Sequence, residues 1–446
     1  MATPGDLIRR IPEFSAYATI KIAPDMAVPI TARLRRIIDS KAFQRLRRIR
    51  QLSLSDRVFP SATHTRFSHG LGVYQNVLDY VRHLDGTTGF ARHFEERDYL
   101  AILLAGLLHD LGHYPCAHQL DHVNPFPTHE SLTVGLVEGR LVFEGENLAD
   151  LIWDTFKIEP EAITRFFGAT RTLPDHLMLL RQIIDSPVDA DKCDYLPRDS
   201  YYCGVDYGTG FDRERFIRNL IPARDGRRLS VREKGLMSAE RFQLARYWMY
   251  RSVYWGHTVR ALITMLAKAC EYFRAIPDPA SFEPLLLTFN DHNFLDWLYG
   301  MVTGPGRELV EMVHLRREPY KRLLTVSYHH DPDSYLKLQE AANRDRITAW
   351  LTGWAARLGG EAEPHHLIWD SPPIYKTDTW ESFLITLSTG EEKPIAKESP
   401  VIDALSQAFL HGVRKIRLFG HPRLAALVRK HRQGFPTVAE LLANPG

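Results

Sequence analysis

The sequence has few cysteines and no long apolar run. Its four cysteines, Cys116, Cys193, Cys203 and Cys270, form no CxxC pair and are too few to be the disulfide framework of a 446-residue chain. The longest apolar run covers only residues 100–108, whereas a bilayer-spanning helix needs roughly 20 residues. A signal-peptide core is also absent from the N-terminus. We therefore expect a cytoplasmic protein in a reducing environment, without a membrane partner.

The chain also lacks an excess of charge of one sign. Its 56 basic and 54 acidic side chains leave a net charge of +2, so no global field attracts nucleic acid or anionic lipid. Hydrophobic residues make up 44% and charged residues 25%, as in soluble globular proteins, which excludes disordered and collagen-like chains. The motifs GxxxxGK[ST], GxGxxG and HExxH are absent, which excludes P-loop, dinucleotide-binding and zincin sites.

Apolar residues recur mostly at helical spacing, and strand-like segments are few. We predict a mainly α fold, with a helical catalytic core in residues 1–330 and a small α+β C-terminal lobe in residues 331–446. The predicted helices cover 33–52, 66–83, 96–111, 175–184, 191–198, 239–273 and 291–302. Strands are predicted at 382–388 and 415–419.

Histidines are concentrated in one part of the chain. Nine of the 20 lie between His64 and His129, and the other eleven are spread over the remaining 380 residues. Histidine is both a common metal ligand and a common proton shuttle, so this density within apolar sequence favours a functional site over scattered surface histidines.

The His109-Asp110 pair lies at the polar end of the most apolar of the predicted helices, 96–111. Such groups are costly to bury unless they are paired or bound to a metal. His113 comes four residues after His109, on the same helix face and one turn further on. A metal ligand on one turn can therefore have a catalytic partner on the next.

A second polar segment lies downstream, where residues 188–195 read VDADKCDY. Alone, its three carboxylates are typical of a solvated acidic face. Together with the histidines, they offer the carboxylate that a site of two histidines and one aspartate still lacks.

The order His69, His109-Asp110, Asp191 resembles the H…HD…D signature of the HD-domain phosphohydrolases. Three longer blocks resemble the deoxynucleoside triphosphate triphosphohydrolase branch of that family: FPSATHTRFSH at 59–69, HDLGHYPCAHQLD at 109–121 and DADKCDYLPRD at 189–199. The segment Ser53-Leu54-Ser55 departs from the glycine triplet of the vertebrate members.

The resemblance implies a role for each matching residue. Metal ligands would be His69, His109, Asp110 and Asp191. Catalytic residues would be His113, His118, Asp121 and His129. Substrate-binding residues would be Gln51, Leu52, Arg66, Lys192, Tyr195 and Asp199, with Tyr254 or His257 facing the base. Gln51 and Asp199 would hold the sugar 3′-hydroxyl, and Leu52 would pack where a 2′-hydroxyl would project.

Phosphate esters hydrolyse very slowly, so an enzyme must supply a nucleophile and neutralise charge on phosphorus. A divalent metal acidifies a water molecule and offsets phosphoryl charge, as do the nearby cations Arg66 and Lys192. Nitrogen and oxygen ligands without thiolate suit Mn, Fe, Ni, Zn or Mg, and the sequence does not choose among them.

Residues 33–50 carry eight basic side chains against the single acid Asp39. Three interpretations stay open: a solvated helix face, a nucleic-acid-binding surface, and a guanine-nucleotide effector site. By the resemblance, the effector site would bind GTP or dGTP through Lys21, Asp39, Gln44 and Arg47, in a homo-oligomer that is a dimer or a tetramer. The aromatic and basic residues between 247 and 260 have a simpler interpretation as core.

The sequence therefore predicts metal-dependent hydrolysis of dNTP to deoxynucleoside and triphosphate, with activation by a guanine nucleotide. One alternative is an HD phosphohydrolase or phosphodiesterase that acts on another nucleotide. The other is a nucleic-acid-binding module with a vestigial site, although nucleic acid is the less favoured partner.

Overall fold

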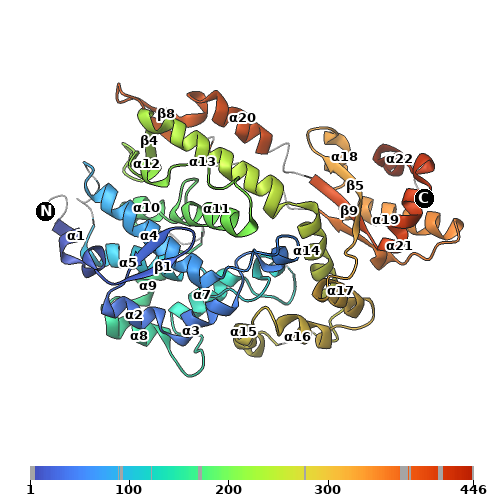
Figure 1. Cartoon of the computed structure of the whole chain (residues 1–446), viewed down its shortest axis with the longest axis horizontal. Coiled ribbons are helices and arrows are strands. Elements are labelled where there is room, and N and C mark those ends of the chain that lie inside the picture. The colour runs from blue at the N-terminus through green and yellow to red at the C-terminus, as the bar shows by residue number, and fades with distance from the viewer. Residues whose placement is uncertain are drawn as a thin grey trace. The chain divides into compact units, whose positions relative to one another are not determined.

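The computed structural model divides into two compact units, each assembled from separate parts of the chain (Figure 1). It describes residues 6–88, 90, 94–121, 123–168, 173–275, 278–371, 380, 383–409 and 415–443. The first unit comprises 1–249, 277–292 and 379–403, and the second comprises 250–276, 293–378 and 404–446. In the described part of the chain, no helix is both long and apolar enough to cross a membrane.

The first unit is built mainly of helices. They are α1 (Asp6–Arg10), α2 (Ala32–Ile38), α3 (Lys41–Gln44), α4 (Arg66–Asp85), α5 (Glu96–Leu108), α6 (Ala117–Leu120), α7 (His129–Val137), α8 (Leu148–Phe156), α9 (Pro160–Thr164), α10 (Asp175–Arg181), α11 (Ala190–Cys203), α12 (Arg213–Ile217), α13 (Leu236–Met249) and α15 (Pro279–Thr288). Short 3₁₀ turns are η1 (Pro12–Ser15), η2 (Arg45–Arg48), η3 (Ser53–Arg57), η5 (Glu233–Gly235) and η9 (Ile395–Lys397).

Helices α4, α5 and α11 form the centre of this unit, with α4 packed against both of the others (Figure 1). Helix α5 is buried along its whole length from Asp98 to Leu108, as its nearly continuous apolar sequence predicts. Glu95 and Asp98 form a capping box at its start. Helix α11 starts at Asp189, whose side chain accepts a hydrogen bond from the backbone of Lys192. The ends of these helices hold most of the predicted metal ligands.

Two small sheets complete the first unit. Strands β1 (Thr19–Ile22) and β2 (Met26–Pro29) form an antiparallel hairpin. Strands β3 (Leu220–Pro222), β4 (Leu229–Arg232), β7 (Leu384–Thr386) and β8 (Glu392–Pro394) form a sheet in that order, in which only the β4–β7 pair is parallel.

The second unit contains a three-stranded antiparallel sheet in the order β5–β9–β6, from β5 (Lys321–Ser327), β6 (Leu367–Asp370) and β9 (Lys415–Gly420). Its helices are α14 (His257–Cys270), α16 (Phe294–Met301), α17 (Pro305–His314), α18 (Pro332–Lys337), α19 (Ala341–Arg357), α21 (Pro422–Lys430) and α22 (Val438–Ala443). Shorter turns are the π-helix η6 (Tyr250–Tyr254), η7 (Pro364–His366) and η11 (Arg432–Gly434). Buried residues such as Ile347, Leu351 and Leu418 form its core. Helix α20 (Pro400–Ala408) begins in the first unit and ends in the second.

The mainly α fold is confirmed, and so are the strands near 384 and 415. The predictions of one continuous helix at 33–52 and of another at 239–273 were wrong. The basic stretch breaks at Ser40, whose extended backbone ends α2 and whose side chain accepts from the Phe43 backbone to start α3. The stretch 239–273 is interrupted by η6 and by the extended backbone of Gly256. The division into a helical catalytic core of residues 1–330 and a small α+β lobe of residues 331–446 remains a prediction.

Candidate metal centre and active site

Four side chains converge where α4, α5 and α11 meet. His69 comes from α4, His109 and Asp110 directly follow α5, and Asp191 lies in the first turn of α11. The Nε2 of His69 lies 3.1 Å from Oδ1 of Asp191 and 3.6 Å from Oδ2 of Asp110. The Nε2 of His109 lies 3.5 Å from Oδ1 of Asp110 and 3.9 Å from Oδ1 of Asp191. The structure thus brings together the four predicted metal ligands.

The two histidines are arranged as metal ligands require. The Nδ1 of His109 donates a hydrogen bond to the carbonyl of Gly106, at 3.0 Å, so its Nε2 carries a free lone pair. That Nε2 is buried and has no hydrogen-bond partner among the described residues. The His69 and His109 rings are inclined at 76°, which lets their in-plane lone pairs meet at one point. Two nitrogen and two carboxylate ligands therefore fit a divalent metal.

A buried ion pair supports His69 from behind. The Nδ1 of His69 lies 2.8 Å from Oδ2 of Asp194. Arg198, four residues further along α11, donates two hydrogen bonds to the same carboxylate, at 2.8 and 2.6 Å. A Cβ on Gly72 would lie 1.8 Å from Oδ1 of Asp194, so only glycine admits the carboxylate here. This contact takes up Nδ1, so that the Nε2 of His69 faces Asp191 and Asp110, two other predicted metal ligands.

The charged side chains at this site shift one another's pKa values. Burial lowers the pKa of His69, but hydrogen bonds and charges from Asp191 and Asp194 outweigh it and raise that pKa to about 10. Burial raises the pKa of Asp110, yet the neighbouring histidines and Arg66, which donates a hydrogen bond to it, hold that pKa well below its usual value. The carboxylate is therefore ionised and ready to bind a cation.

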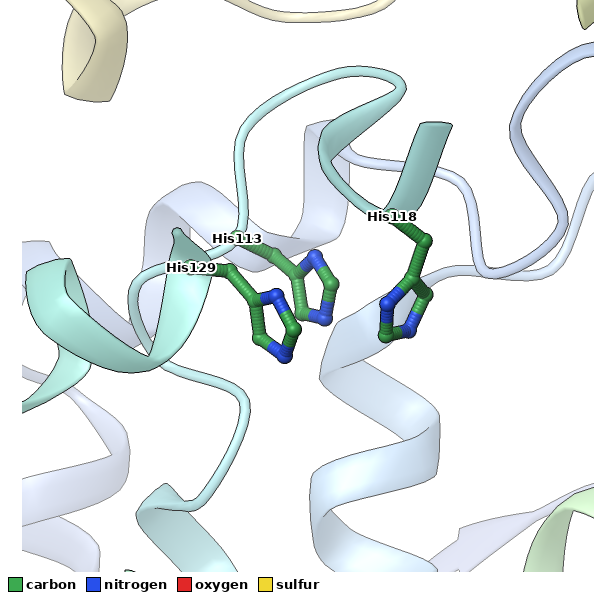
Figure 2. Close-up of side chains that lie close together, drawn as sticks. All are labelled: His113, His118 and His129. Atoms are coloured by element: carbon green, nitrogen blue, oxygen red, sulfur yellow. The ribbon is translucent and has the colours of Figure 1, made fainter. Parts of the chain in front are cut away.

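His113, His118 and His129 form a second group beside the first, and Figure 2 shows their rings close together. The His113 and His129 rings are stacked, with centroids 4.0 Å apart and planes at 13°. Imidazole binds a metal in the plane of the ring, and the planes of two stacked rings do not meet at a shared ion. His118 stands edge-on to both, with centroids 4.6 Å away. This geometry suits proton transfer better than chelation.

Asp121 links two members of this histidine group. Its carboxylate lies 2.7 Å from Nδ1 of His129 and 3.8 Å from Nδ1 of His118. The Nε2 of His113 lies 3.2 Å from Oδ1 of Asp110, which joins the two groups. The side chain of His118 is 52% exposed and is the most accessible of the three.

The turn between the two groups packs tightly on α7. A Cβ on Gly112 would lie 2.2 Å from the Thr133 nitrogen and 2.3 Å from the His129 oxygen, so the position requires glycine. The Gly112 nitrogen donates to Oγ1 of Thr133, at 2.8 Å, and that hydroxyl lies 2.9 Å from the His129 carbonyl. The HD turn and the start of α7 are thereby in direct backbone contact.

Two of the predicted sugar-binding residues are buried in the same unit. The Oε1 of Gln51 is buried and has no hydrogen-bond partner in the described ranges. Asp199 accepts from Nε2 of His64, at 2.7 Å, and the His64 ring stacks on Tyr202. Leu52, next to Gln51, is half-buried.

Lys192 lines a cavity of about 360 Å³ together with Arg228 and Arg246. The Nζ of Lys192 lies 2.6 Å from Oδ2 of Asp189, and the Nε of Arg228 lies 2.7 Å from Oδ2 of Asp225, so both cations are already paired. Tyr195, on the same helix as Lys192, is half-buried. The lining of the cavity has three cations and one carboxylate, that of Asp185.

The remaining predicted residues lie elsewhere. Tyr254 and His257 belong to the second unit, so their place against the base stays a prediction. Arg47 donates to Oε1 of Gln44, at 2.7 Å, and its guanidinium lies 3.6 Å from the centre of the Phe67 ring. Asp39, which ends α2 before the break at Ser40, and Lys21, on β1, are exposed.

The sequence did not single out three supporting residues: Asp194, Arg198 and His64. Helical spacing offers a signal for two of them, since Asp194 lies three residues after Asp191 and Arg198 four residues after Asp194. For His64 the only signal is its place in the histidine-rich stretch.

Comparison with known proteins agrees with this site. Residues 66–198 match the HD domain, and residues 211–421 match the HD associated region. The uncharacterized protein YwfO of Bacillus subtilis is 33% identical over 252 residues, which are 54% of this chain and 52% of the relative. Human deoxynucleoside triphosphate triphosphohydrolase SAMHD1 is 28% identical over 330 residues, or 63% of this chain and 51% of that protein.

A solved phosphohydrolase from Bacteroides thetaiotaomicron has the same fold, with a TM-score of 0.64 at 23% identity, over 90% of this chain and 99% of its own. The chain spans about half the length of the curated relatives it matches. The two matching regions together cover both the metal ligands and most of the C-terminal half. The chain belongs to the HD-domain phosphohydrolase family.

Proposed function

We propose that this protein hydrolyses deoxynucleoside triphosphates to the deoxynucleoside and triphosphate, with a divalent metal held by His69, His109, Asp110 and Asp191. Water adds at the α-phosphorus, the bond from phosphorus to the 5′-oxygen breaks, and that oxygen takes up a proton. The metal supplies Lewis acidity and a source of hydroxide at neutral pH.

The histidine group supplies the proton transfers. Burial and the charge of Arg66 hold the pKa of His113 well below its usual value, so its ring is neutral and accepts a proton. Asp121 fixes Nδ1 of His129 as a donor, which leaves Nε2 of His129 to exchange a proton with the leaving oxygen. His118, the exposed member, connects the group to solvent.

One observation carries the assignment to a nucleotide with a free 3′-hydroxyl: the buried Oε1 of Gln51, which has no hydrogen-bond partner among the described residues. A buried acceptor of this kind is costly unless a ligand donates to it, and a sugar 3′-hydroxyl supplies that donor. The backbone carbonyl of Gln51 accepts from Arg66, so this acceptor lies close to the phosphate-binding guanidinium. The resemblance to SAMHD1, named as a dNTP triphosphohydrolase, supports the same substrate.

The cavity lined by Lys192, Arg228 and Arg246 supports a substrate with several phosphates. Its three cations, against the single lining carboxylate of Asp185, would compensate part of the charge of a triphosphate. We include Tyr195, Asp199 and Leu52 in the substrate site, and Tyr254 or His257 near the base.

We further propose that GTP or dGTP activates the enzyme by binding at Lys21, Asp39, Gln44 and Arg47 in a homo-oligomer, a dimer or a tetramer. The contact between Gln44 and Arg47 supports this, because it places an amide beside a guanidinium on the surface. The thiols of Cys193, Cys203 and Cys270 are buried and form no disulfide among the described residues, which supports a place in the cytoplasm.

Product analysis tests the proposal. Purified protein is incubated with Mn²⁺ and each dNTP, singly and mixed, and the products are separated by chromatography. Deoxynucleoside and tripolyphosphate are expected. Release of pyrophosphate or of monophosphate would instead indicate another HD phosphohydrolase. Salt-dependent nucleic-acid binding without any hydrolysis would indicate a vestigial site.

A further inference from the structure

Arg45 is a buried cation directed at the backbone of the HD turn. Its side chain comes from η2, and its Nη2 donates to the carbonyls of Leu111 and His113, both at 2.7 Å. These carbonyls belong to the turn that follows α5, three and five residues beyond its last residue, Leu108. Arg45 therefore supplies donors to the turn that follows His109 and Asp110.

Few other contacts compensate the buried positive charge of Arg45. Burial lowers the pKa of Arg45 to about 9. Its Nε and Nη1 are buried without a hydrogen-bond partner, and no carboxylate lies within ion-pair distance of it among the described residues. The Phe143 ring, 5.9 Å away, and the negative end of the α5 dipole are its remaining favourable contacts. A buried cation with so few partners contributes poorly to stability, which points to a role in function.

The turn is fixed from the opposite side by α7. Oγ1 of Thr133 accepts from the Gly112 nitrogen, whereas Arg45 donates to the residues on either side of that glycine. The His113 ring lies between the Asp110 carboxylate and the His129 ring. A shift of the His113 backbone would therefore change its distance to both.

We propose that Arg45 is a positioning residue for His113. Among the described residues, its side chain makes hydrogen bonds to these two carbonyls and none to the side chains of the metal ligands or of the proposed substrate residues. The effect of Arg45 on kcat rests on the proposed function. The structural consequence of the proposal, a fixed turn at residues 110–113, is independent of the substrate.

The test compares Arg45→Ala with Arg48→Ala, which removes an exposed arginine from the same 3₁₀ turn. For Arg45→Ala we expect kcat to fall about 100-fold, as for a catalytic group displaced by ~1 Å, with KM within twofold of the wild type. Metal content should be unchanged, and amide hydrogen exchange should accelerate at residues 110–113. Guanidinium ion, at concentrations too low to unfold the protein, should restore part of kcat. Arg48→Ala should match the wild type in every measurement.

Arg45→Lys keeps the charge and one donor group, so it should retain an intermediate kcat. It also serves if Arg45→Ala does not fold. Unchanged kcat and unchanged exchange in a folded Arg45 variant would overturn the proposal, as would loss of metal in step with activity or failure of both variants to fold. If the wild type hydrolyses no dNTP, the proposed function fails, and the exchange of residues 110–113 still decides the role of Arg45.

Discussion

The Nδ1 of His69 lies 2.8 Å from a carboxylate oxygen of Asp194, whose other contacts are two hydrogen bonds from Arg198. All three side chains are almost completely buried. The contact orients the His69 ring and selects the tautomer that can bind a metal. Asp194 is therefore a determinant of metal affinity although it is not a predicted ligand.

Asp194→Asn should weaken metal binding by about 10–100-fold, because an amide oxygen is a poorer acceptor for the His69 Nδ1–H. The change also breaks a buried ion pair, so the free energy of unfolding should fall by about 3–5 kcal/mol. Metal affinity is measured by competition with a chelator, below the unfolding temperature. The exposed Asp154→Asn, on α8, is the control. Equal affinity in the two variants would contradict the role of Asp194.

Metal binding and turnover should separate between the two histidine groups. Asp191→Ala removes a ligand, so elemental analysis should find the metal lost. His113→Ala should keep about one metal per chain and lose about 10²–10⁴-fold in kcat, because it removes a proton-transfer group only. Equal metal loss in both variants would show that the stacked histidines also bind metal.

The 3′-hydroxyl should be required for catalysis. With a 3′-deoxy substrate, the buried Oε1 of Gln51 receives no donor, and kcat/KM should fall by ~10⁴-fold or more. Steady-state kinetics with dATP and its 3′-deoxy analogue measure the effect. Gln51→Leu should reduce the difference between them. Equal rates on both substrates in the wild type would remove Gln51 from the sugar site.

Leu52 should discriminate against ribonucleotides. An apolar side chain rejects a hydroxyl only by crowding and desolvation, which gives ~10²-fold selectivity. Leu52→Gly should therefore raise the ratio of ATP to dATP hydrolysis toward one. If the wild type already hydrolyses both at the same rate, Leu52 has no such role.

Effector control should depend on Arg47. Hydrolysis of a non-guanine dNTP should rise when dGTP is added, with growth of the oligomer measured by light scattering, because the effector binds the assembled form better. Arg47→Ala should abolish both effects at unchanged metal content. Full activity on a single dNTP, in an oligomer of constant size, would leave the basic segment with a structural role only.

The sequence predicted those site residues that lie at the ends of regular helices. His69, His109 and Asp191 lie at ends of helices, and the resemblance of their order to the H…HD…D signature grouped them. The basic stretch was harder, because its composition favours a helix throughout. The decisive event there is local: the Ser40 hydroxyl accepts from the Phe43 backbone, and this cap ends one helix and begins another.

Contacts between distant segments that belong to no motif could not be predicted. Arg45 reaches the HD turn 66 and 68 residues away, and His64 reaches Asp199 across 135 residues. Neither pair has a spacing that a helix or strand imposes. Residues of this kind look like ordinary charges or core histidines until the chain has folded.

Gly112 gives the HD turn an unusual mechanical property. Since its backbone lies against the backbone of α7, no flexible side chain separates His109 and Asp110 from His129. We therefore expect the predicted metal ligands and the histidine group to move together, so that thermal motion changes the distances between them little. On the proposed function, substrates with different bases would then meet the same arrangement of reacting groups.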